Sequence, residues 1–532
     1  MNYMERRIVL SRRIMLMIAV SFFLTLSVDI FAATFTVSKL ADTNDGVCNA
    51  DCSLREAISA ANLLASTDEI RFDAVLFQVP RTIVLTGGSL TIANNGGVTI
   101  AGPGPGLLTI SGNNQTRVIV NIDGGSMVIY GVTIRDGNGN NMGAGGGIAN
   151  SGRLILHNSV VRNNLGSPFA GGIYNGGFMQ ITDSAVIDNN GSLNGGGIYN
   201  TDAAGVLSIY NSTISGNLAR RDGGGIYNSG SVTIVNSTIS NNTASSVNDG
   251  GNGGGVLTTW FGNQNSRVTI INSTIANNAC KAGGGGILSD GSLVDLTNVT
   301  ITGNSVTDPL VFYYGGGVIN YQENFPGTVR AKNTIIADNT SANGQAPDFG
   351  GVLTSLGYNL IENTHWTAFT QPPQTDIFGQ DPLLGPLSAN GGDTSTRMPL
   401  AGSPVIDRVI SGSPETDQRY YLRPTDGDGN GSTNGDIGAV EAGSSSASLT
   451  TRISGRVIRA PNRGDYPGQV QLIDNLGNVK YIAVNQFGYY RFANVQAGRT
   501  YILRVVSKRN SYLPKVIFVT GSVDSLNFSV GS

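Results

Sequence analysis

The sequence predicts an all-β protein: a right-handed, single-stranded parallel β-helix with an N-terminal capping helix, followed by a small β-sandwich. Two interleaved motifs predict the β-helix, the first of them repeating every 25 to 31 residues, and alternating apolar and polar residues after residue 450 predict the sandwich. Glycine makes up 74 of the 532 residues, and only 13% are charged. A disordered chain would carry more charge and fewer β-branched residues, so the glycines belong to a folded repeat.

The first motif joins a run of glycines to a short apolar strand, as in GGGIYN. Its apolar position recurs at Ile148, Ile173, Ile198, Ile226, Val256, Ile287 and Val318. The second motif, typified by NSTI, begins at Asn158, Asp183, Asn211, Asn236, Asn272, Asn298 and Asn333. With a third short strand between them, one repeat is too small to bury a core, whereas stacked repeats form three parallel sheets around one apolar interior. Parallel connections are right-handed in nearly all sheets, which sets the hand of the β-helix.

Alternation along each strand gives the motif residues their directions. The isoleucine points inward, the tyrosine after it points outward, and the asparagine lies at a turn where side-chain amides hydrogen-bond from coil to coil. The three columns are Ile173, Ile198 and Ile226; Tyr174, Tyr199 and Tyr227; and Asn175, Asn200 and Asn228. Building the coil accounts for all of these residues.

Residues 1–33 have the layout of a secretory signal peptide. Four arginines precede an apolar run over residues 14–28, and Ala32 and Ala33 offer a cleavage site. An uncleaved membrane anchor is the alternative. No later stretch is long and apolar enough to span a bilayer, so we expect no transmembrane segment after cleavage. The mature chain is slightly acidic and has no basic stripe, which argues against nucleic acid as a partner.

Residues 34–80 are predicted to cap the β-helix, whose repeats occupy residues 81–349. Ser53 and Glu56 form a capping box, and apolar residues at helical spacing follow, so one amphipathic helix begins at Ser53. The apolar positions of this helix are Leu54, Ala57, Ile58, Ala61 and Leu64. Such a helix can cover the apolar end and the unpaired strand edges of a solenoid.

The chain has three cysteines. Cys48 and Cys52, in CNADC, are close enough in sequence to form a disulfide after export. Cys280 then remains, and we interpret it as a small, semi-buried residue near a loop.

The repeat fades after residue 349. Residues 350–441 are predicted to form the C-terminal end of the β-helix and include the Gly- and Asp-rich stretch RPTDGDGNGSTNGDIGAVE. Residues 442–450, AGSSSASLT, have the composition of a flexible linker. Residues 451–532 contain about seven alternating segments, which predict a small antiparallel β-sandwich that acts as a spacer or a binding module.

Four parts of the chain resemble known families. CSLREAISAAN is similar to the N-terminal CSLREA-type segment of exported bacterial repeat proteins, and the GGGIYN and NSTISGN repeats resemble pectin-lyase-like and polymorphic-outer-membrane-protein-like β-helices. The stretch from SLGYNLI through DPLLGPL and GSPVID to DIGAVE resembles the choice-of-anchor Q segment. The tail, with PGQVQLID and GYYRFANVQAGRTY, is similar to carboxypeptidase-regulatory-like domains of transthyretin-like fold. The resemblances imply a bacterial protein that is secreted or held at the cell surface or outer membrane.

A run of oxygen-bearing residues predicts a Ca²⁺ site. Asp426, Asp428 and Asn430 alternate before a glycine, as in D-x-D-x-N-G loops, and hard oxygen ligands at alternate positions suit Ca²⁺. The twelfth position is not the usual Glu, so Asp436 or Glu441 would have to complete the site. The alternative is a plain polar turn without a cofactor.

The loops around the glycine runs predict an extended ligand-binding face, because equivalent loops stack along one edge of a solenoid. Exposed aromatic side chains can stack on sugar rings, and mixed charges can bind uronates. The candidate residues are Trp260, Phe261, Tyr321, Arg220, Arg221 and Asp222. The alternative is that these residues form solvated loops with local packing only.

Catalytic motifs are weak. A glycosidase needs two carboxyl groups facing one cleft, and the coil region offers only isolated carboxylates such as Asp183 and Asp222. We therefore predict no catalytic residues, and we predict an exported surface or extracellular protein with a structural, adhesive or carbohydrate-binding role and a polysaccharide or cell-surface glycan as its partner. The alternative is a polysaccharide lyase or glycoside hydrolase on the same pectin-lyase-like scaffold.

Overall fold

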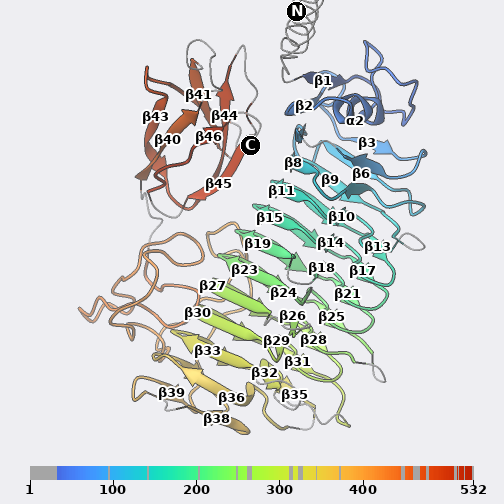
Figure 1. Cartoon of the computed structure of the whole chain (residues 1–532). Coiled ribbons are helices and arrows are strands. Elements are labelled where there is room, and N and C mark those ends of the chain that lie inside the picture. The colour runs from blue at the N-terminus through green and yellow to red at the C-terminus, as the bar shows by residue number, and fades with distance from the viewer. Residues whose placement is uncertain are drawn as a thin grey trace, which may run out of the picture.

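The computed structural model of the chain shows a long stack of coils with a second β-unit beside its N-terminal half (Figure 1). The described residues are 33–93, 96–139, 143–201, 204–246, 250–260, 266–310, 315–321, 327–342, 344–370, 373–444, 450–458, 468–474, 478–507, 512, 514–519 and 522–529. The predicted leader lies outside them except for Ala33. Within the described residues, no helix is long and apolar enough to cross a membrane.

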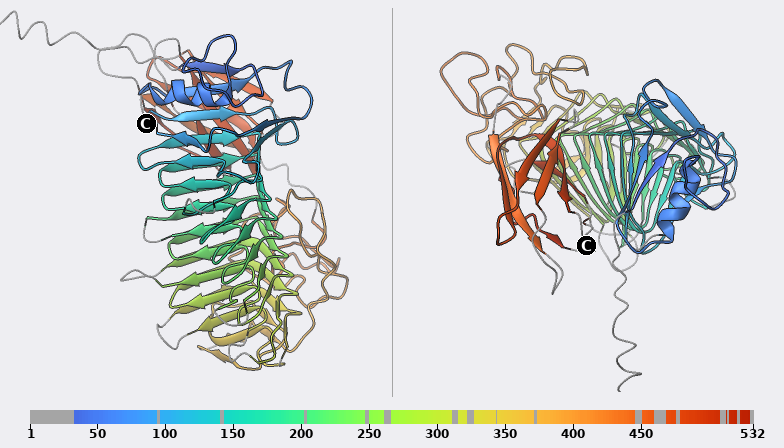
Figure 2. Two further views of the ribbon diagram at one scale, coloured as in Figure 1. Left: turned by 90° about the vertical axis from the view of Figure 1, so that its right-hand side faces the viewer. Right: turned by 90° about the horizontal axis from the view of Figure 1, so that it is seen from above.

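The coils form the predicted parallel β-helix, whose strands stack in columns (Figure 2). The first column is β1 (Thr34–Val37), β2 (Asp68–Phe72), β5 (Val98–Ala101), β8 (Ser126–Tyr130), β11 (Arg153–His157), β15 (Phe178–Thr182), β19 (Val206–Tyr210), β23 (Ser231–Val235), β27 (Arg267–Ala276), β30 (Leu293–Thr302), β33 (Thr328–Lys332), β36 (Phe349–Ser355) and β38 (Thr367–Phe369). The second column is β3 (Arg81–Val84), β6 (Leu108–Ser111), β9 (Thr133–Arg135), β12 (Val160–Arg162), β16 (Ala185–Ile187), β20 (Thr213–Ser215), β24 (Thr238–Ser240), the second halves of β27 and β30, β34 (Ile335–Ala337), β37 (Leu360–Ile361) and β39 (Ile377–Phe378).

The third column carries the GGGIYN motif, and a fourth column was not predicted. The third is β4 (Leu90–Ile92), β7 (Ile119–Asn121), β10 (Ile148–Asn150), β14 (Ile173–Asn175), β18 (Ile198–Asn200), β22 (Ile226–Asn228), β26 (Val256–Thr259), β29 (Ile287–Asp290), β32 (Val318–Tyr321) and the start of β36. The fourth is β13 (Leu165–Gly166), β17 (Asn190–Gly191), β21 (Leu218–Ala219), β25 (Thr243–Ala244), β28 (Ala279–Cys280), β31 (Ser305–Val306) and β35 (Thr340–Ser341). Two-residue strands are too short to leave a periodic signal in the sequence.

Like residues meet like along each column, as predicted. Ile173 pairs in register with Ile198, and Ile198 with Ile226, and all three are fully buried. The outward tyrosines after them stack, with ring centroids 5.8 Å apart for Tyr174–Tyr199 and 4.7 Å apart for Tyr199–Tyr227. The single apolar interior therefore runs the length of the β-helix.

Two asparagine ladders run inside the coils. In the predicted ladder, Nδ2 of Asn175 donates to Oδ1 of Asn200 at 2.7 Å, and Asn200 donates to Asn228 at 2.9 Å. A second ladder, which the sequence analysis did not separate from the turns, uses the last residue of the NSTISGN motif. Its members are Asn164, Asn189, Asn217, Asn242, Asn278, Asn304 and Asn339, and it ends on the carboxylate of Asp348.

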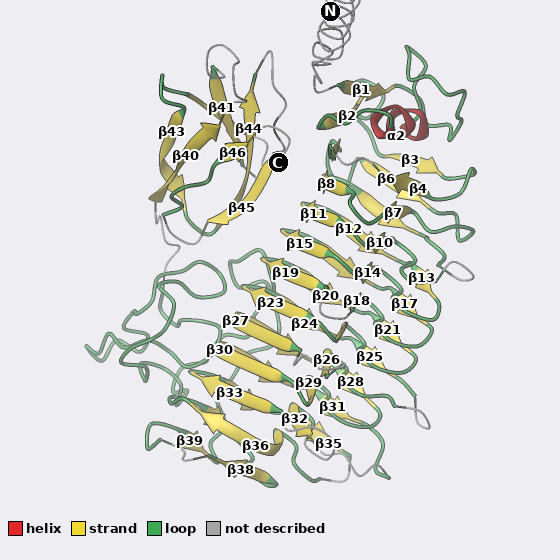
Figure 3. Cartoon of the chain, in the orientation of Figure 1, coloured by secondary structure: helices red, strands yellow, loops and turns green. Residues whose placement is uncertain are grey.

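One helix, α2 (Leu54–Asn62), stands among the described strands (Figure 3). The capping box is formed as predicted: Oγ of Ser53 accepts from the Glu56 backbone N–H at 3.0 Å, and Glu56 Oε2 accepts from the Ser53 N–H at 2.7 Å. The buried face of α2 joins the interior of the β-helix. Leu64, expected on this face, is 38% exposed because the helix ends at Asn62.

The cysteines occupy separate places. A disulfide joins Cys48 to Cys52 beside α2. Cys280 in β28 is 1% exposed, so it is more deeply buried than the sequence analysis expected. It packs between Ala244 and Val306 of the fourth column, both of which are also buried.

Residues 379–444 run back along the outside of the coils after the last strand, β39 (Figure 1). Their contacts follow the turn between the first and second columns. Nδ2 of Asn272 donates to the carbonyl of Thr416 at 2.7 Å, and Nδ2 of Asn298 donates to that of Gly438 at 3.2 Å. The segment thus contacts the coils in which the second motif begins at Asn211, Asn236, Asn272, Asn298 and Asn333.

The described residues of the C-terminal unit form seven strands in two sheets. One sheet is β40 (Thr450–Ile458), β43 (Tyr489–Gln496) and β46 (Phe528–Ser529), and the other is β41 (Gln469–Ile473), β42 (Val479–Ala483), β44 (Arg499–Val506) and β45 (Lys515–Val519). The pairing of β46 with β40 is parallel, which corrects the expectation of a wholly antiparallel unit. Residues 445–449 of the predicted linker lie outside the described residues, and Ala442 at its start is buried.

This unit folds back onto the first column and is not held out as a spacer (Figure 2). Ile502 and Val516 pack against Val128 and Ile155, which point outward from β8 and β11. Nη2 of Arg504 adds an ion pair of 2.7 Å to a Glu69 carboxylate in β2. Apolar residues on an outward face of a solenoid require a cover of this kind.

Candidate functional site

A groove of about 310 Å³ opens on the outer face of the third column, across β22, β26, β29 and β32. We call it the acidic groove. It is lined by Arg221, Asp222, Tyr227, Asn252, Leu257, Thr259, Leu288, Asp290 and Tyr321. Tyr227, the last ring of the tyrosine stack, lies at one end of this lining.

Strand alternation builds the floor and one wall of the acidic groove. Because Val256 and Ile287 point into the core, the next residues, Leu257 and Leu288, face outward and form a small apolar cluster with Tyr227. The side chains two residues further along each strand point outward again and form one wall of the groove. Its members, Thr259, Asp290 and Tyr321, pair in register from coil to coil.

The opposite wall is formed by the loops that enter the glycine runs. Gly253 has a φ of +62°, and a Cβ there would lie 2.6 Å from Cβ of Leu257. Only glycine therefore lets this loop rest on the groove floor. The loops bring Arg221, Asp222 and Asn252 over the floor.

Both carboxyl groups of the groove are held by hydrogen bonds and are partly dehydrated. Asp222 Oδ1 accepts from the backbone N–H and from Nδ2 of Asn252, at 3.0 Å and 3.1 Å, and its Oδ2 lies 3.3 Å from Nε of Arg221. Asp290 Oδ2 accepts from Oγ1 of Thr259 at 3.2 Å. Burial raises the pKa of Asp222 and of Asp290, and these hydrogen bonds oppose the shift.

Two acceptor atoms in the groove lack a donor. Oδ1 of Asp290 and Oδ1 of Asn252 are both buried, and neither has a hydrogen-bond partner among the described residues. Unsatisfied buried acceptors are costly, and they mark where a ligand with hydroxyl or amine donors gains hydrogen bonds.

The groove brings together three of the six residues predicted for the ligand face. Arg221, Asp222 and Tyr321 line it, whereas Arg220 is exposed outside it. Trp260 follows β26, and its backbone N–H donates to the carbonyl of Asp290 at 2.9 Å. Phe261 lies outside the described residues.

The sequence analysis missed the rest of the groove lining, most importantly Asp290 and Tyr227. Their signal was present in the motif itself. GGGILSD places an aspartate at the register position that GGGVINY fills with Tyr321. Counting outward positions across the variants of the motif would have found it.

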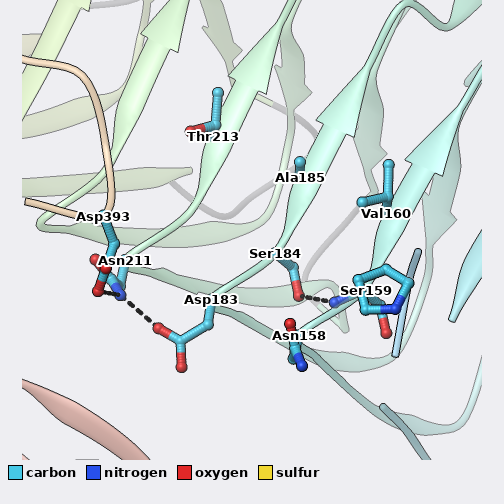
Figure 4. Close-up of a pocket in the computed structure, with 10 residues that line it drawn as sticks. Asn158, Ser159, Val160, Asp183, Ser184, Ala185, Asn211, Thr213 and Asp393 are labelled. Atoms are coloured by element: carbon cyan, nitrogen blue, oxygen red, sulfur yellow. Dashed lines mark hydrogen bonds between the residues drawn. The ribbon is translucent and has the colours of Figure 1, made fainter. Parts of the chain in front are cut away.

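A second cavity, of about 300 Å³, lies at the turn between the first and second columns (Figure 4). We call it the carboxyl pocket. Asp183, Asn211 and Asp393 meet on one side of it. Nδ2 of Asn211 donates to Oδ1 of Asp183 at 2.5 Å and to Oδ2 of Asp393 at 2.9 Å. The two carboxylates are 210 residues apart in the sequence and are not equivalent positions of a repeat. One amide group bridges them.

The covering segment, residues 379–444, contributes Asp393 to the lining of the pocket. Thr394 lies over the coil of Asn236, and its Oγ1 donates to the Asn236 carbonyl at 3.2 Å. Asp393 of the covering segment reaches Asn211, and Thr500 of the C-terminal unit lies beside Asp183. Burial, with Asp393 adding to it, raises the pKa of Asp183 to about 6.

The buried histidine of this region is not a cation. Nδ1 of His157 lies 3.6 Å from Oδ2 of Asp183. Burial lowers the pKa of His157 to about 4, so the ring is neutral at pH 7.

The predicted Ca²⁺ ligands are only partly brought together. Asp426 and Asp428 meet with Asp407, which the sequence analysis did not include, and carboxylate oxygens of the three lie within 4.8 Å of one another. Asn430 hydrogen-bonds to Asp428 at 2.8 Å. Asp436 is fully buried and instead accepts from the backbone N–H groups of Asp407 and Ala442, at 2.8 Å and 2.6 Å.

Glu441, the alternative twelfth ligand, is also engaged elsewhere. Its Oε2 pairs with Nη1 of Arg423 at 3.1 Å, and both side chains are buried. The loop therefore offers hard oxygen ligands of the kind that Ca²⁺ prefers, with Asp407 in the place expected for Asp436. Calcium binding stays a prediction.

No family model matches this chain, and neither does any curated protein sequence. Two solved structures are similar in part. The crystal structure of pectate lyase Pel9A has a TM-score of 0.46 and 15% identity over 78% of this chain and 97% of that chain. The A-module of the mannuronan C-5 epimerase AlgE4 of Azotobacter vinelandii has a TM-score of 0.34 and 16% identity over 65% of this chain and 93% of that chain. Both likenesses are distant, and the parallel β-helix of this chain rests on its own strand register.

Proposed function

We propose that this is an exported protein that binds carbohydrate in the acidic groove. The unsatisfied acceptors over an apolar floor carry this proposal. A sugar ring has one apolar face, which suits Leu257, Leu288 and Tyr227, and a rim of hydroxyl groups, which can donate to Asp290 and Asn252.

The groove also favours an extended glycan over an isolated sugar. The coils repeat at the strand spacing of about 4.8 Å, so equivalent wall positions form a continuous row along the β-helix. Arg221 at one wall suits a carboxylate-bearing sugar such as a uronate, while Asp222 and Asp290 can accept hydrogen bonds from sugar hydroxyl groups.

Affinity electrophoresis in gels that contain neutral or uronate polysaccharides tests this proposal. Asp290→Ala and Leu288→Ala should abolish the retardation that the wild-type protein shows in at least one gel. Asp123→Ala is the matched control, since Asp123 is exposed and outside the groove. If wild type and both groove variants migrate alike in every gel, the groove is not a glycan site.

The runner-up function is cleavage of the same class of ligand. It is favoured by one observation, namely that Asp222 and Asp290 both have raised pKa values and lie on facing walls of one groove. Release of reducing ends or unsaturated uronates by the wild-type protein, and not by Asp290→Asn, would select this function. Retardation without product would select binding.

Export and surface attachment rest on the predicted leader and on the family resemblances. We infer that residues 350–441 form a choice-of-anchor-like segment and that the C-terminal sheets form a transthyretin-like module. Cell fractionation tests the location: recovery of the full-length chain in the cytosol would contradict export.

A further inference from the structure

The carboxyl pocket differs in chemistry from the acidic groove, and we propose that it binds a primary ammonium group, from either an amino sugar or a lysine side chain. This inference does not depend on the proposed function. Asp183, Asn211 and Asp393 carry it, and they come from two coils and from the covering segment (Figure 4).

The pocket is lined by two carboxyl groups and by one buried amide oxygen that lacks a donor among the described residues. Asn211 is 4% exposed, its Nδ2 is held between the two carboxylates, and its Oδ1 has no hydrogen-bond partner among the described residues. Oδ2 of Asp183 is buried beside His157 and Thr500 of the C-terminal unit, and a hydrogen bond from Thr500 lowers the pKa of Asp183 against the larger effect of burial. An ammonium group has three donors and no acceptor, so it matches this set of oxygens.

The charges of the pocket call for a cation. Within the described ranges, neither Asp183 nor Asp393 forms an ion pair with a lysine or arginine, and His157 beside Asp183 is neutral at pH 7. Arg499 of the C-terminal unit is close enough to lower the pKa of Asp183 slightly, yet burial and Asp393 still raise it. A bound ammonium group would offset the repulsion between the carboxylates.

The shape of the pocket fits a small head group. Its floor is formed by Val160, Ala185 and Thr213, small side chains that pair in register on β12, β16 and β20. The hydroxyl of Ser184 is already committed, because it donates to the Thr182 carbonyl at 2.7 Å. A volume of about 300 Å³ admits one sugar ring or the end of a lysine side chain.

Calorimetric titration of the full-length protein with three probes tests the proposal: glucosamine, N-acetylglucosamine and Nα-acetyl-lysine amide. The variants are Asp183→Asn and Asp393→Asn. Asp183→Asn places an amide where the neighbouring coils carry Asn158 and Asn211, so the fold is expected to persist. Asp188→Asn, at an exposed turn of the same coil, is the matched control.

We expect saturable binding of at least one amine, weakened roughly tenfold or more by either pocket variant, because each variant removes a charged acceptor of the ammonium group. Asp188→Asn should bind as the wild type does. Glucosamine binding identifies an amino sugar as the source, and binding of the lysine amide alone identifies a peptide. Equal binding of N-acetylglucosamine, no binding of either amine, or equal loss in the control would overturn the proposal.

Discussion

Truncating one member of the second asparagine ladder should destabilise the whole β-helix, and Asn217→Ala is the sharpest case. The Asn217 side chain is 1% exposed and takes part in four hydrogen bonds. Its Oδ1 accepts from the backbone N–H and from Nδ2 of Asn189, both at 3.0 Å. Its Nδ2 donates to the Val186 carbonyl and to Oδ1 of Asn242, both at 2.9 Å.

The expected loss follows from this inventory. Each buried hydrogen bond contributes about 1 kcal/mol net, so four lost bonds cost about 4 kcal/mol in the free energy of unfolding. Alanine has no polar side-chain atom and cannot restore any of them. Asn190→Ala, at the exposed neighbouring position in β17, should change the free energy by about 0.5 kcal/mol or less.

Urea unfolding followed by far-ultraviolet circular dichroism measures the difference. The midpoint of Asn217→Ala should fall clearly below that of the wild type, while that of Asn190→Ala stays close to it. A midpoint of Asn217→Ala within error of Asn190→Ala would refute the view that the ladder stabilises the coils.

Three further predictions concern other parts of the molecule. Burial raises the pKa of Asp348 and of Asp436 to about 7, above the unfolded value of 3.8, so their contribution to stability is complete below pH 3.8 and is lost as pH rises through 7. The urea midpoint should therefore be lower at pH 8 than at pH 5.5, with a smaller difference in Asp348→Asn; a midpoint that rises with pH would contradict this. Ser53→Ala removes the cap of α2 and should cost about 0.5–2 kcal/mol in a thermal melt, with Ser151→Ala as the exposed control and an unchanged melt as the contrary result. Calcium should raise the melting temperature of the wild-type protein and not that of Asp426→Ala. If chelator changes the melting temperature of both proteins equally, the loop is a plain polar turn and not a calcium site.

The candidate sites show which functional residues can be predicted from a repeat and which cannot. Tyr321 and Asp222 were accessible to sequence reasoning because they flank the glycine runs that mark each coil. Asp290 was missed because a single variant repeat holds it, and only the pairing of β26, β29 and β32 shows that it stands beside Thr259 and Tyr321.

The carboxyl pocket was beyond sequence reasoning. Asp183 looked isolated, because its partner Asp393 lies in a segment without regular strands. Where such a segment runs is decided by many weak contacts along the asparagine turn, and none of them has a sequence period.

The sequence by itself determined the coil: its inward isoleucines, its outward tyrosines, its asparagine ladder and the capped helix at its start. These features are local or recur from coil to coil, so the structure of one repeat predicts that of the next. Only the tertiary structure decided what covers the coils. Residues 379–444 and the C-terminal sheets pack by surface complementarity between segments far apart in the chain, and that packing, together with the register of single variant residues, creates both pockets.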